Sequence, residues 1–129
     1  MTSRSCPFCL IELDRIVAAN DLAFVVRDGF PLSLGHSLII VRRHVASFFD
    51  IASEERYAML ALLDSAKKAL EQHCQPSGYN IGINDGLDAG QTVPHLHIHL
   101  IPRYRGDCVD PRGGVRWVLP EKADYWTKE

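Results

Sequence analysis

Three histidines alternate with aliphatic residues between positions 95 and 101, and this alternation constrains the fold more than any other feature of the chain. The segment reads His95-Leu-His97-Ile-His99-Leu-Ile. Because successive side chains of a β-strand point to opposite faces, the pattern predicts a strand with its aliphatic side chains on a core and its imidazoles in one row. Same-side neighbours in such a row lie roughly 6.6–6.8 Å apart. Half of the six histidines of the chain are in this row, so we interpret it as a functional site rather than as a solvated strand face.

Two kinds of chemistry fit a row of this spacing. Alternating histidines can hold a catalytic metal ion, as in zinc hydrolases. Alternatively, the middle imidazole can act as a nucleophile while its neighbours orient it and move protons. The spacing alone allows both. The polar bend Gly90-Gln-Thr-Val93 precedes the row, and Pro102 and Arg103 follow it, so we expect the strand to end at the proline.

The remaining hydrophobic pattern predicts an α+β fold with a mainly antiparallel sheet of about five strands and one long helix. The other strands are expected at residues 15–19, 22–27, 36–41 and 79–84. The helix is expected from Ser53, as its N-cap, to about Cys74, because apolar residues recur there at steps of three and four. The segment 106–129 has little periodicity. Its aromatic residues predict that it docks as a tail on the body or on a partner subunit.

Composition restricts the class of protein. The 129 residues, 47% hydrophobic and 23% charged, predict one ordered domain over residues 1–129. The net charge of −2 and the lack of a basic run argue against a nucleic-acid partner. No apolar run approaches the roughly 20 residues that span a bilayer, and the N-terminus lacks the apolar region of a signal peptide. We expect a soluble cytoplasmic protein without a membrane partner or an organic cofactor.

The histidine row and its surroundings resemble the histidine triad superfamily of nucleotide hydrolases and transferases. The row has the form His-x-His-x-His-x-x, in which x is apolar. The resemblance extends to other segments in the same order: Asp28, Gly35-His-Ser-Leu-Ile-Ile-Val41, Arg43-His44, Asn84-Asp-Gly86, Ala89-Gly-Gln91-Thr-Val-Pro94 and Ile101-Pro-Arg103. It covers residues 5–105, most of the chain, and implies that these residues are the core of the domain and have the α+β fold of that superfamily. It also implies a homodimer, since members are commonly dimeric.

The resemblance implies a reaction at phosphorus. His97 is expected to attack the α-phosphate of a dinucleoside polyphosphate or a nucleoside phosphoramidate, with a purine base, and to form a nucleotidyl-histidine intermediate. Water then releases the nucleoside monophosphate. The other residues expected at the phosphate or the leaving group are His36, His99, Gln91 and Thr92, together with main-chain N–H groups of the 90–93 loop. The alternatives are a zinc-dependent hydrolase that uses the row as metal ligands and a non-catalytic nucleotide-binding module.

The nucleotide is expected to contact two further groups of residues. Phe8, Ile11 and Val26 resemble positions that line the base pocket of the superfamily. Asp28 resembles a carboxylate that accepts hydrogen bonds from the ribose, and Asn84 is expected to contact ribose or phosphate. The full set of predicted nucleotide-binding residues is Phe8, Ile11, Val26, Asp28, Asn84, Gly90 and Val93.

The pair Cys6-Pro-Phe-Cys9 predicts half of a zinc site, because a two-residue spacer lets both sulfurs reach one ion. A thioredoxin-like redox motif follows a strand, and only five residues precede this pair, so we do not favour that interpretation. Cys74 and Cys108 are isolated, and histidines are therefore the expected partners. By resemblance to zinc-bearing superfamily members, the remaining ligands are His44 and His95, which gives a structural Zn²⁺ site.

Overall fold

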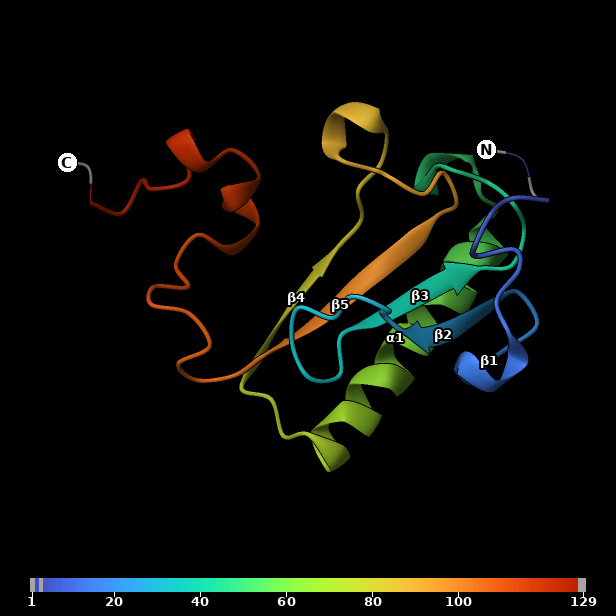
Figure 1. Ribbon diagram of the computed structural model, residues 1–129, viewed down its shortest axis with the longest axis horizontal. Helices are drawn as coiled ribbons and strands as arrows, with labels where there is room; N and C mark the ends of the chain where they lie inside the picture. The colour runs from blue at the N-terminus through green and yellow to red at the C-terminus, as the bar shows by residue number, and fades with distance from the viewer. Residues whose placement is uncertain (1, 3, 128–129) are drawn as a thin grey trace.

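Aliphatic strands and one amphipathic helix build the fold in the computed structural model, which describes residues 2 and 4–127. In this part of the chain, five strands form one antiparallel sheet in the order β1-β2-β3-β5-β4. The strands are β1 Ile16–Ala19, β2 Ala23–Arg27, β3 Ser37–Val41, β4 Gly78–Gly82 and β5 His97–Arg103, and helix α1 is Ser53–His73. Figure 1 shows α1 crossing one face of the sheet. The predicted α+β fold is confirmed.

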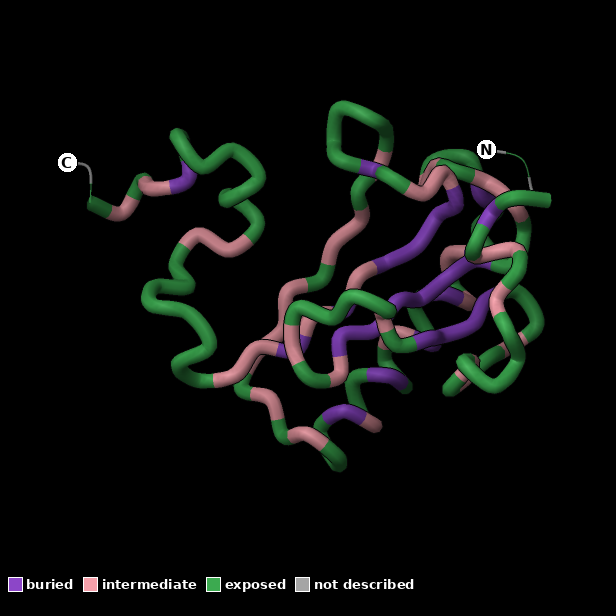
Figure 2. Tube along the Cα trace, viewed as in Figure 1, coloured by how far each residue is buried: buried purple, intermediate pink, exposed green. Residues whose placement is uncertain are grey.

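The main core lies between the sheet and α1. The expected helical stripe is confirmed, because Met59, Leu62, Ala66 and Leu70 are buried there. Leu96, Ile98 and Leu100 face them from the sheet side. In Figure 2 the buried segments follow the central strands and the inner side of the helix. The histidines that alternate with these leucine and isoleucine residues therefore lie on the face of the sheet that α1 does not cover.

The uncovered face carries a second, smaller apolar cluster beside the histidines. Phe24, Val26, Leu38 and Ile40 form its buried part, and Phe8, Ile11 and Ile16 pack against it. On this face His97 pairs with Ile40 and His99 pairs with Leu38 across the β3–β5 ladder. The two histidines thus stand at the border of an apolar surface made by β2 and β3.

Strand β5 begins and ends two residues later than the sequence predicts. It starts at His97 rather than His95, and it continues through Pro102, which pairs with Tyr79. The main-chain oxygen of Arg103 accepts a hydrogen bond from the N–H of Ser77 on the β4 side. Because the main-chain groups of successive residues in a strand point to opposite neighbours, the nitrogen of Pro102 faces the β3 side. The β3 ladder already ends at the Ser37–Leu100 pair. The missing N–H of the proline therefore removes no ladder bond.

Helix α1 is capped differently from the prediction. Ala52 occupies the N-cap position and Ser53 is the first helical residue, so the prediction of Ser53 as N-cap is wrong. The Glu55 carboxylate accepts a hydrogen bond from the Ala52 N–H at 2.9 Å and forms an ion pair with Arg43 at 2.9 Å. A carboxylate from the third helical position therefore satisfies the main-chain N–H of the N-cap residue.

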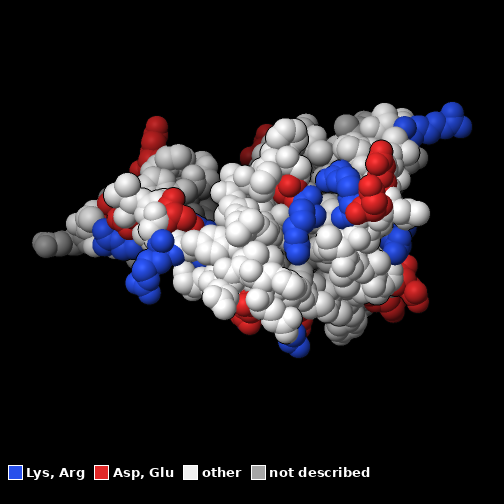
Figure 3. Space-filling model, turned by 60° about the horizontal axis from the view of Figure 1, so that its bottom comes forward, with Lys and Arg blue, Asp and Glu red and all other residues white. Residues whose placement is uncertain are grey.

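The tail forms local structure beside β4. The 3-10 helices η4 Gly114–Val118 and η5 Pro120–Lys122 follow the sheet, and Figure 1 shows them on the β4 side of the molecule. A Cβ on Gly114 would lie 3.1 Å from the Asn80 side-chain nitrogen, so η4 touches β4 closely. No helix among the described residues is long and apolar enough to cross a membrane. In Figure 3, basic and acidic side chains stand beside one another on the visible face.

Candidate active site and metal centre

His97 has its two ring nitrogens in different roles. Its Nδ1 lies 2.7 Å from the main-chain oxygen of His95. A carbonyl oxygen only accepts hydrogen bonds, so Nδ1 carries the proton and Nε2 keeps a free lone pair. The side chain is buried, and burial lowers the pKa of His97, against the opposing effect of the His95 carbonyl. The imidazole is therefore neutral near pH 7 and has one nitrogen available as a nucleophile.

His36 and His99 form a second hydrogen-bond chain beside His97. The Leu32 N–H donates to Nδ1 of His36 at 3.0 Å, so His36 carries its proton on Nε2. That Nε2 donates in turn to Nδ1 of His99 at 3.0 Å, and His99 therefore carries its proton on its own Nε2. Burial lowers the pKa of both His36 and His99, which favours these neutral forms. This hydrogen-bond chain ends in the Nε2–H donor of His99. The His99 ring lies next to the His97 ring, with 5.1 Å between the ring centroids.

Asp28 lies at the outer side of the same chain. One of its carboxylate oxygens accepts a hydrogen bond from the Phe30 N–H at 2.9 Å. The other oxygen lies 3.4 Å from Nε2 of His36. The residue thus shapes the turn after β2 and also places a negative charge beside His36. Its side chain keeps some exposure, and its contact with ribose stays a prediction.

The loop before β5 is held by the Gln91 side chain. The Gln91 amide oxygen accepts from the Gly86 N–H at 2.9 Å, and its NH₂ group donates to the main-chain oxygens of Ala46 and Val93. In this arrangement Gln91 contacts main chain on both sides of the loop. Gly90 supports the same bend with a φ of +90°, a region that glycine occupies without strain. Thr92 is exposed and lies with Gln91 at the surface of the loop.

The residues expected to line the base pocket are on the β2–β3 side of the histidines. The Phe8 ring stands edge-on to the His97 ring, 4.9 Å between centroids, and Ile11 packs on the same apolar cluster. Val26 is a completely buried member of that cluster. Phe8 and Ile11 are therefore the members of this group with surface left for a ligand, whereas Val26 supports them from below.

Four predicted metal ligands converge at the entrance to β5. The Sγ atoms of Cys6 and Cys9 and the Nδ1 atoms of His44 and His95 all lie within 4.8 Å of one another. The Cys6–His95, Cys9–His44 and Cys9–His95 distances are 3.3, 3.2 and 3.5 Å. The two Nδ1 atoms are 3.3 Å apart. Ligand atoms at the corners of a tetrahedral zinc site are separated by about 3.3–3.8 Å. The four residues thus fit one tetrahedral ion.

The surroundings of His95 also fit a metal ligand. Its Nε2 donates to the main-chain oxygen of Val41 at 2.6 Å, so the lone pair of Nδ1 points to the two sulfurs and to His44. Burial and the neighbouring Cys6 raise the pKa of the Cys9 thiol. A thiolate at Cys9 would therefore need a nearby cation, such as a metal ion, to stabilise it. The same His95 residue offers its ring to the metal cluster and its main-chain oxygen to His97.

The row itself does not form a three-histidine metal site. Among the described residues, the groups able to hold an ion are the Cys6 cluster and the trio of Asp28, His36 and His99. The ligating nitrogen of His95 faces Cys6, while Nδ1 of His97 is bonded to main chain. This geometry argues against the alternative in which the whole row shares one catalytic ion.

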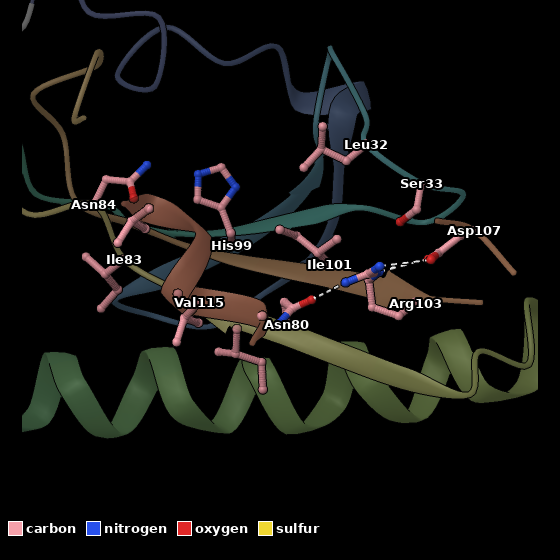
Figure 4. Close-up of a pocket in the computed structure, with 14 residues that line it drawn as sticks. Leu32, Ser33, Asn80, Ile83, Asn84, His99, Ile101, Arg103, Asp107 and Val115 are labelled. Atoms are coloured by element: carbon pink, nitrogen blue, oxygen red, sulfur yellow. Dashed lines mark hydrogen bonds and ion pairs between the residues drawn. The ribbon is translucent and has the colours of Figure 1, made fainter. Parts of the chain in front are cut away.

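Sequence reasoning predicted the main-chain carbonyl that orients His97 but missed the main-chain groups that orient two other histidines. The Leu32 N–H and the Val41 carbonyl fix the proton positions of His36 and His95. A main-chain group leaves no mark in residue identity, so no sequence signal could have identified these two contacts. The predicted Asn84 lies beside His99 at a cavity on the β4 side (Figure 4), apart from the group around Phe8.

Comparisons with known proteins agree with this arrangement. Residues 12–106 match the family model described as HIT domain. An uncharacterized 16.1 kDa HIT-like protein of Mycoplasma pneumoniae is 34% identical, with 100% of this chain and 94% of that protein covered. The bis(5'-adenosyl)-triphosphatase of Dictyostelium discoideum is 34% identical over 76% of this chain and 66% of its own. A zinc-bound histidine triad family protein from Mycobacterium smegmatis superposes with a TM-score of 0.75 and 32% identity, covering 84% of this chain and 82% of that one.

Proposed function

This chain belongs to the HIT domain family, and we propose that it is a nucleotide hydrolase or transferase acting at the α-phosphate of nucleoside phosphate derivatives. The substrate is a dinucleoside polyphosphate or a nucleoside phosphoramidate with a purine base. The product is a nucleoside monophosphate, released from a nucleotidyl-histidine intermediate on His97. The relative from Dictyostelium discoideum named as a bis(5'-adenosyl)-triphosphatase supports this class of substrate.

The observation that carries the proposal is the pair of proton positions at His97 and His99. The bond from Nδ1 of His97 to the His95 carbonyl leaves a lone pair on Nε2. The hydrogen bonds from Leu32 to His36 and from His36 to His99 leave the proton of His99 on its Nε2. A neutral nucleophile thus stands beside an N–H group that can donate a hydrogen bond to charged phosphate oxygens, an arrangement suited to displacement at a phosphate.

In the first step, Nε2 of His97 forms a bond to the α-phosphorus. The bond from phosphorus to the leaving atom breaks, and its electron pair goes to the leaving group. A leaving phosphate oxygen departs as an anion that accepts a hydrogen bond from the Nε2–H of His99, whereas a leaving nitrogen departs already protonated by solvent. In the second step, a water oxygen bonds to phosphorus and the phosphorus–nitrogen bond breaks. The electron pair of that bond returns to Nε2 of His97, one water proton stays on the nucleoside monophosphate, and the other passes to solvent as the product leaves. Main-chain N–H groups and Thr92 in the 90–93 loop offset charge on the non-bridging oxygens.

The base lies against Phe8 and Ile11, and Asp28 accepts hydrogen bonds from the ribose. This assignment follows from the apolar surface that borders His97 and from the partial exposure of the Asp28 carboxylate. Gln91 acts by holding the loop, since its amide is bonded to main chain on both sides. Asn84 contacts the leaving-group side of the phosphate.

Zinc is the ion that we propose for Cys6, Cys9, His44 and His95. A Cys₂His₂ donor set with tetrahedral spacing is typical of structural zinc, and the zinc-bound relative from Mycobacterium smegmatis supports this choice. These four side chains would hold the ion, which would cross-link the N-terminal segment to the β5 entrance and serve a structural role. The chain also acts as a homodimer in the cytoplasm, without nucleic-acid or membrane partners.

The test is steady-state hydrolysis of diadenosine triphosphate and of adenosine 5'-phosphoramidate, followed by chromatography of the released nucleotide. His97→Ala is expected to lose at least about 10³-fold in kcat, since the nucleophile is removed. His73→Ala, which changes an exposed histidine at the end of α1, is the matched control and keeps full activity. Retained activity in His97→Ala would refute the assignment. Binding of nucleoside monophosphate by a wild-type protein without turnover would instead identify a non-catalytic binding module.

A further inference from the structure

His95 belongs to the metal cluster through its side chain and to the candidate active site through its main chain. Its Nδ1 lies 3.3 Å from Cys6 Sγ and 3.3 Å from His44 Nδ1. Its main-chain oxygen accepts the hydrogen bond from Nδ1 of His97 at 2.7 Å. His95 is completely buried, and a close-packed interior leaves little room for one of these contacts to change without the other. The two sites therefore share one residue.

The peptide group between His95 and Leu96 is also attached to the cluster at its N–H end. The Leu96 N–H donates to the main-chain oxygen of Val45 at 2.7 Å, and Val45 directly follows the predicted ligand His44. Because a peptide group is planar, the position of Val45 also sets the direction of the carbonyl that holds His97. The orientation of this peptide group thus depends on two of the predicted ligands.

Phe8 connects the two sites in a second way, because it lies between the two predicted cysteine ligands in the sequence. Its ring stands edge-on to the rings of His95 and His97, with centroid distances of 6.0 and 4.9 Å. The side chain is half-buried and keeps surface for the base of a nucleotide. A base that packs on Phe8 therefore favours the position of the Cys6–Cys9 loop in which both sulfurs face the histidines.

The N-terminal segment has few other attachments to the sheet. Figure 1 shows it at the end of the sheet where β3 ends and β5 begins. In the part of the chain that the structure describes, the hydrogen bonds from residues 4–11 to the sheet and its loops are those of the Cys6 and Cys9 sulfurs. Apart from them, Phe8 and Ile11 pack on the apolar cluster. A segment with so few contacts moves at little cost in free energy, so its position depends on the ligands that hold it.

We propose that a nucleotide and the metal ion bind cooperatively to this chain, with Phe8 and the His95–Leu96 peptide group as the positioning groups that connect the two sites. The inference rests on the proposed function, including its metal site. It deepens that function by making the Cys6 cluster control the affinity for nucleotide. Each ligand strengthens the binding of the other by the same factor, since coupling between two binding sites is reciprocal.

The test measures zinc affinity with and without adenosine monophosphate (AMP), so it needs no turnover. The Kd of AMP is first determined by calorimetry on the zinc-loaded protein. The protein is then titrated with a chromophoric chelator that competes for zinc, once without nucleotide and once with AMP at about 20 times its Kd. In the wild type, AMP is expected to lower the Kd for zinc about fivefold or more, within the usual range of coupling between sites.

Phe8→Ala distinguishes this connection from a general stabilisation of the fold. A ligand that only stabilises the folded state acts according to its concentration relative to its Kd. With AMP at the same multiple of each protein's own Kd, such a general effect would be unchanged in the variant. Loss of the Phe8 ring is instead expected to reduce the effect of AMP on zinc affinity to about half of the wild-type factor or less. Phe8→Leu, which keeps an apolar side chain in the cluster, is a second variant with the same expectation.

The matched control is Ile16→Ala. Ile16 packs on the same apolar cluster but belongs to β1 and lies outside the Cys6–Cys9 loop. Its variant is expected to keep the full effect of AMP on zinc affinity.

Equal zinc affinity with and without AMP, in a wild type that binds both ligands, overturns the inference alone. An effect of AMP that is as large in both Phe8 variants as in the wild type also overturns it, since the coupling then passes through the overall stability of the fold. A wild type that binds no zinc overturns the proposed metal site, and one that binds no AMP overturns the proposed function. The inference is refuted in both of these cases as well.

Discussion

Gly35 packs against the core and directly precedes His36 of the candidate site, and replacing it by alanine should destabilise the fold. Its φ is +90°, a region that side chains rarely adopt. A Cβ at this position would lie 2.6 Å from Cδ2 of Leu70, and 3.5 Å from both Cys74 Sγ and Pro102 Cγ. Leu70 is completely buried against the sheet, so its side chain cannot rotate into solvent to make room.

The expected cost of Gly35→Ala has two parts. A left-handed conformation at a residue with a side chain costs about 1–2 kcal/mol. Forcing an extra methyl group into a filled core costs about 1–3 kcal/mol. The free energy of unfolding should therefore decrease by about 2–5 kcal/mol. Because Gly35 directly precedes His36, relief of the clash also moves that imidazole, and kcat should fall as the His36–His99 bond is lost.

Urea denaturation followed by fluorescence or circular dichroism measures this loss. Gly29→Ala is the matched control, because it lies in the same loop, has no positive φ and would place its methyl group more than 4 Å from every neighbouring atom. It should change the free energy of unfolding by no more than about 0.5 kcal/mol. If Gly35→Ala is no more destabilising than Gly29→Ala, the steric reasoning is wrong.

Two further predictions concern the metal site and pH. Cys6→Ala should release zinc, measured by mass spectrometry of the native protein, and should lower Tm. The control Cys108→Ala, which changes an exposed cysteine, should alter neither the zinc content nor Tm. Wild-type protein that contains no zinc after purification would refute the proposed metal site. Burial lowers the pKa of His36 and His99 below the usual value near 6.5. Below pH 6.5 the unfolded chain therefore binds more protons than the folded protein. The free energy of unfolding should decrease as pH falls through that range. The acid limb of kcat/KM should likewise lie below pH 6.5, and a limb above that value would contradict the neutral hydrogen-bond chain.

Much of the fold was predictable because its signals are periodic. The alternation at residues 96–100 and the helical stripe from Met59 to Leu70 each identify an element and its buried face. The exact limits were not predictable. Whether Pro102 ends a strand depends on which neighbouring strand its nitrogen faces and on whether the ladder with that strand extends as far as Pro102. The cap of α1 likewise depends on a carboxylate that reaches back from Glu55.

The site was predictable to a different depth at each residue. The spacing of Cys6 and Cys9 indicates a shared ligand function, and the resemblance supplied His44 and His95, which the structure brings to one point. Periodicity alone placed His95 in the same row as His97, yet it lies before the strand and turns its ring to the sulfurs. A main-chain contact with Val41 sets the orientation of the His95 ring. Main-chain contacts likewise turn the Gln91 amide toward the protein. Sequence does not encode such contacts by residue type.

The central claim is that His97 becomes covalently attached to the nucleotide. The most direct measurement is intact-mass spectrometry after mixing the protein with diadenosine triphosphate and quenching within milliseconds to seconds. We expect an acid-labile mass increase of one adenylyl group in the wild type and none in His97→Ala. Release of nucleotide by the wild type without any adduct, or an adduct that persists in His97→Ala, would contradict the account.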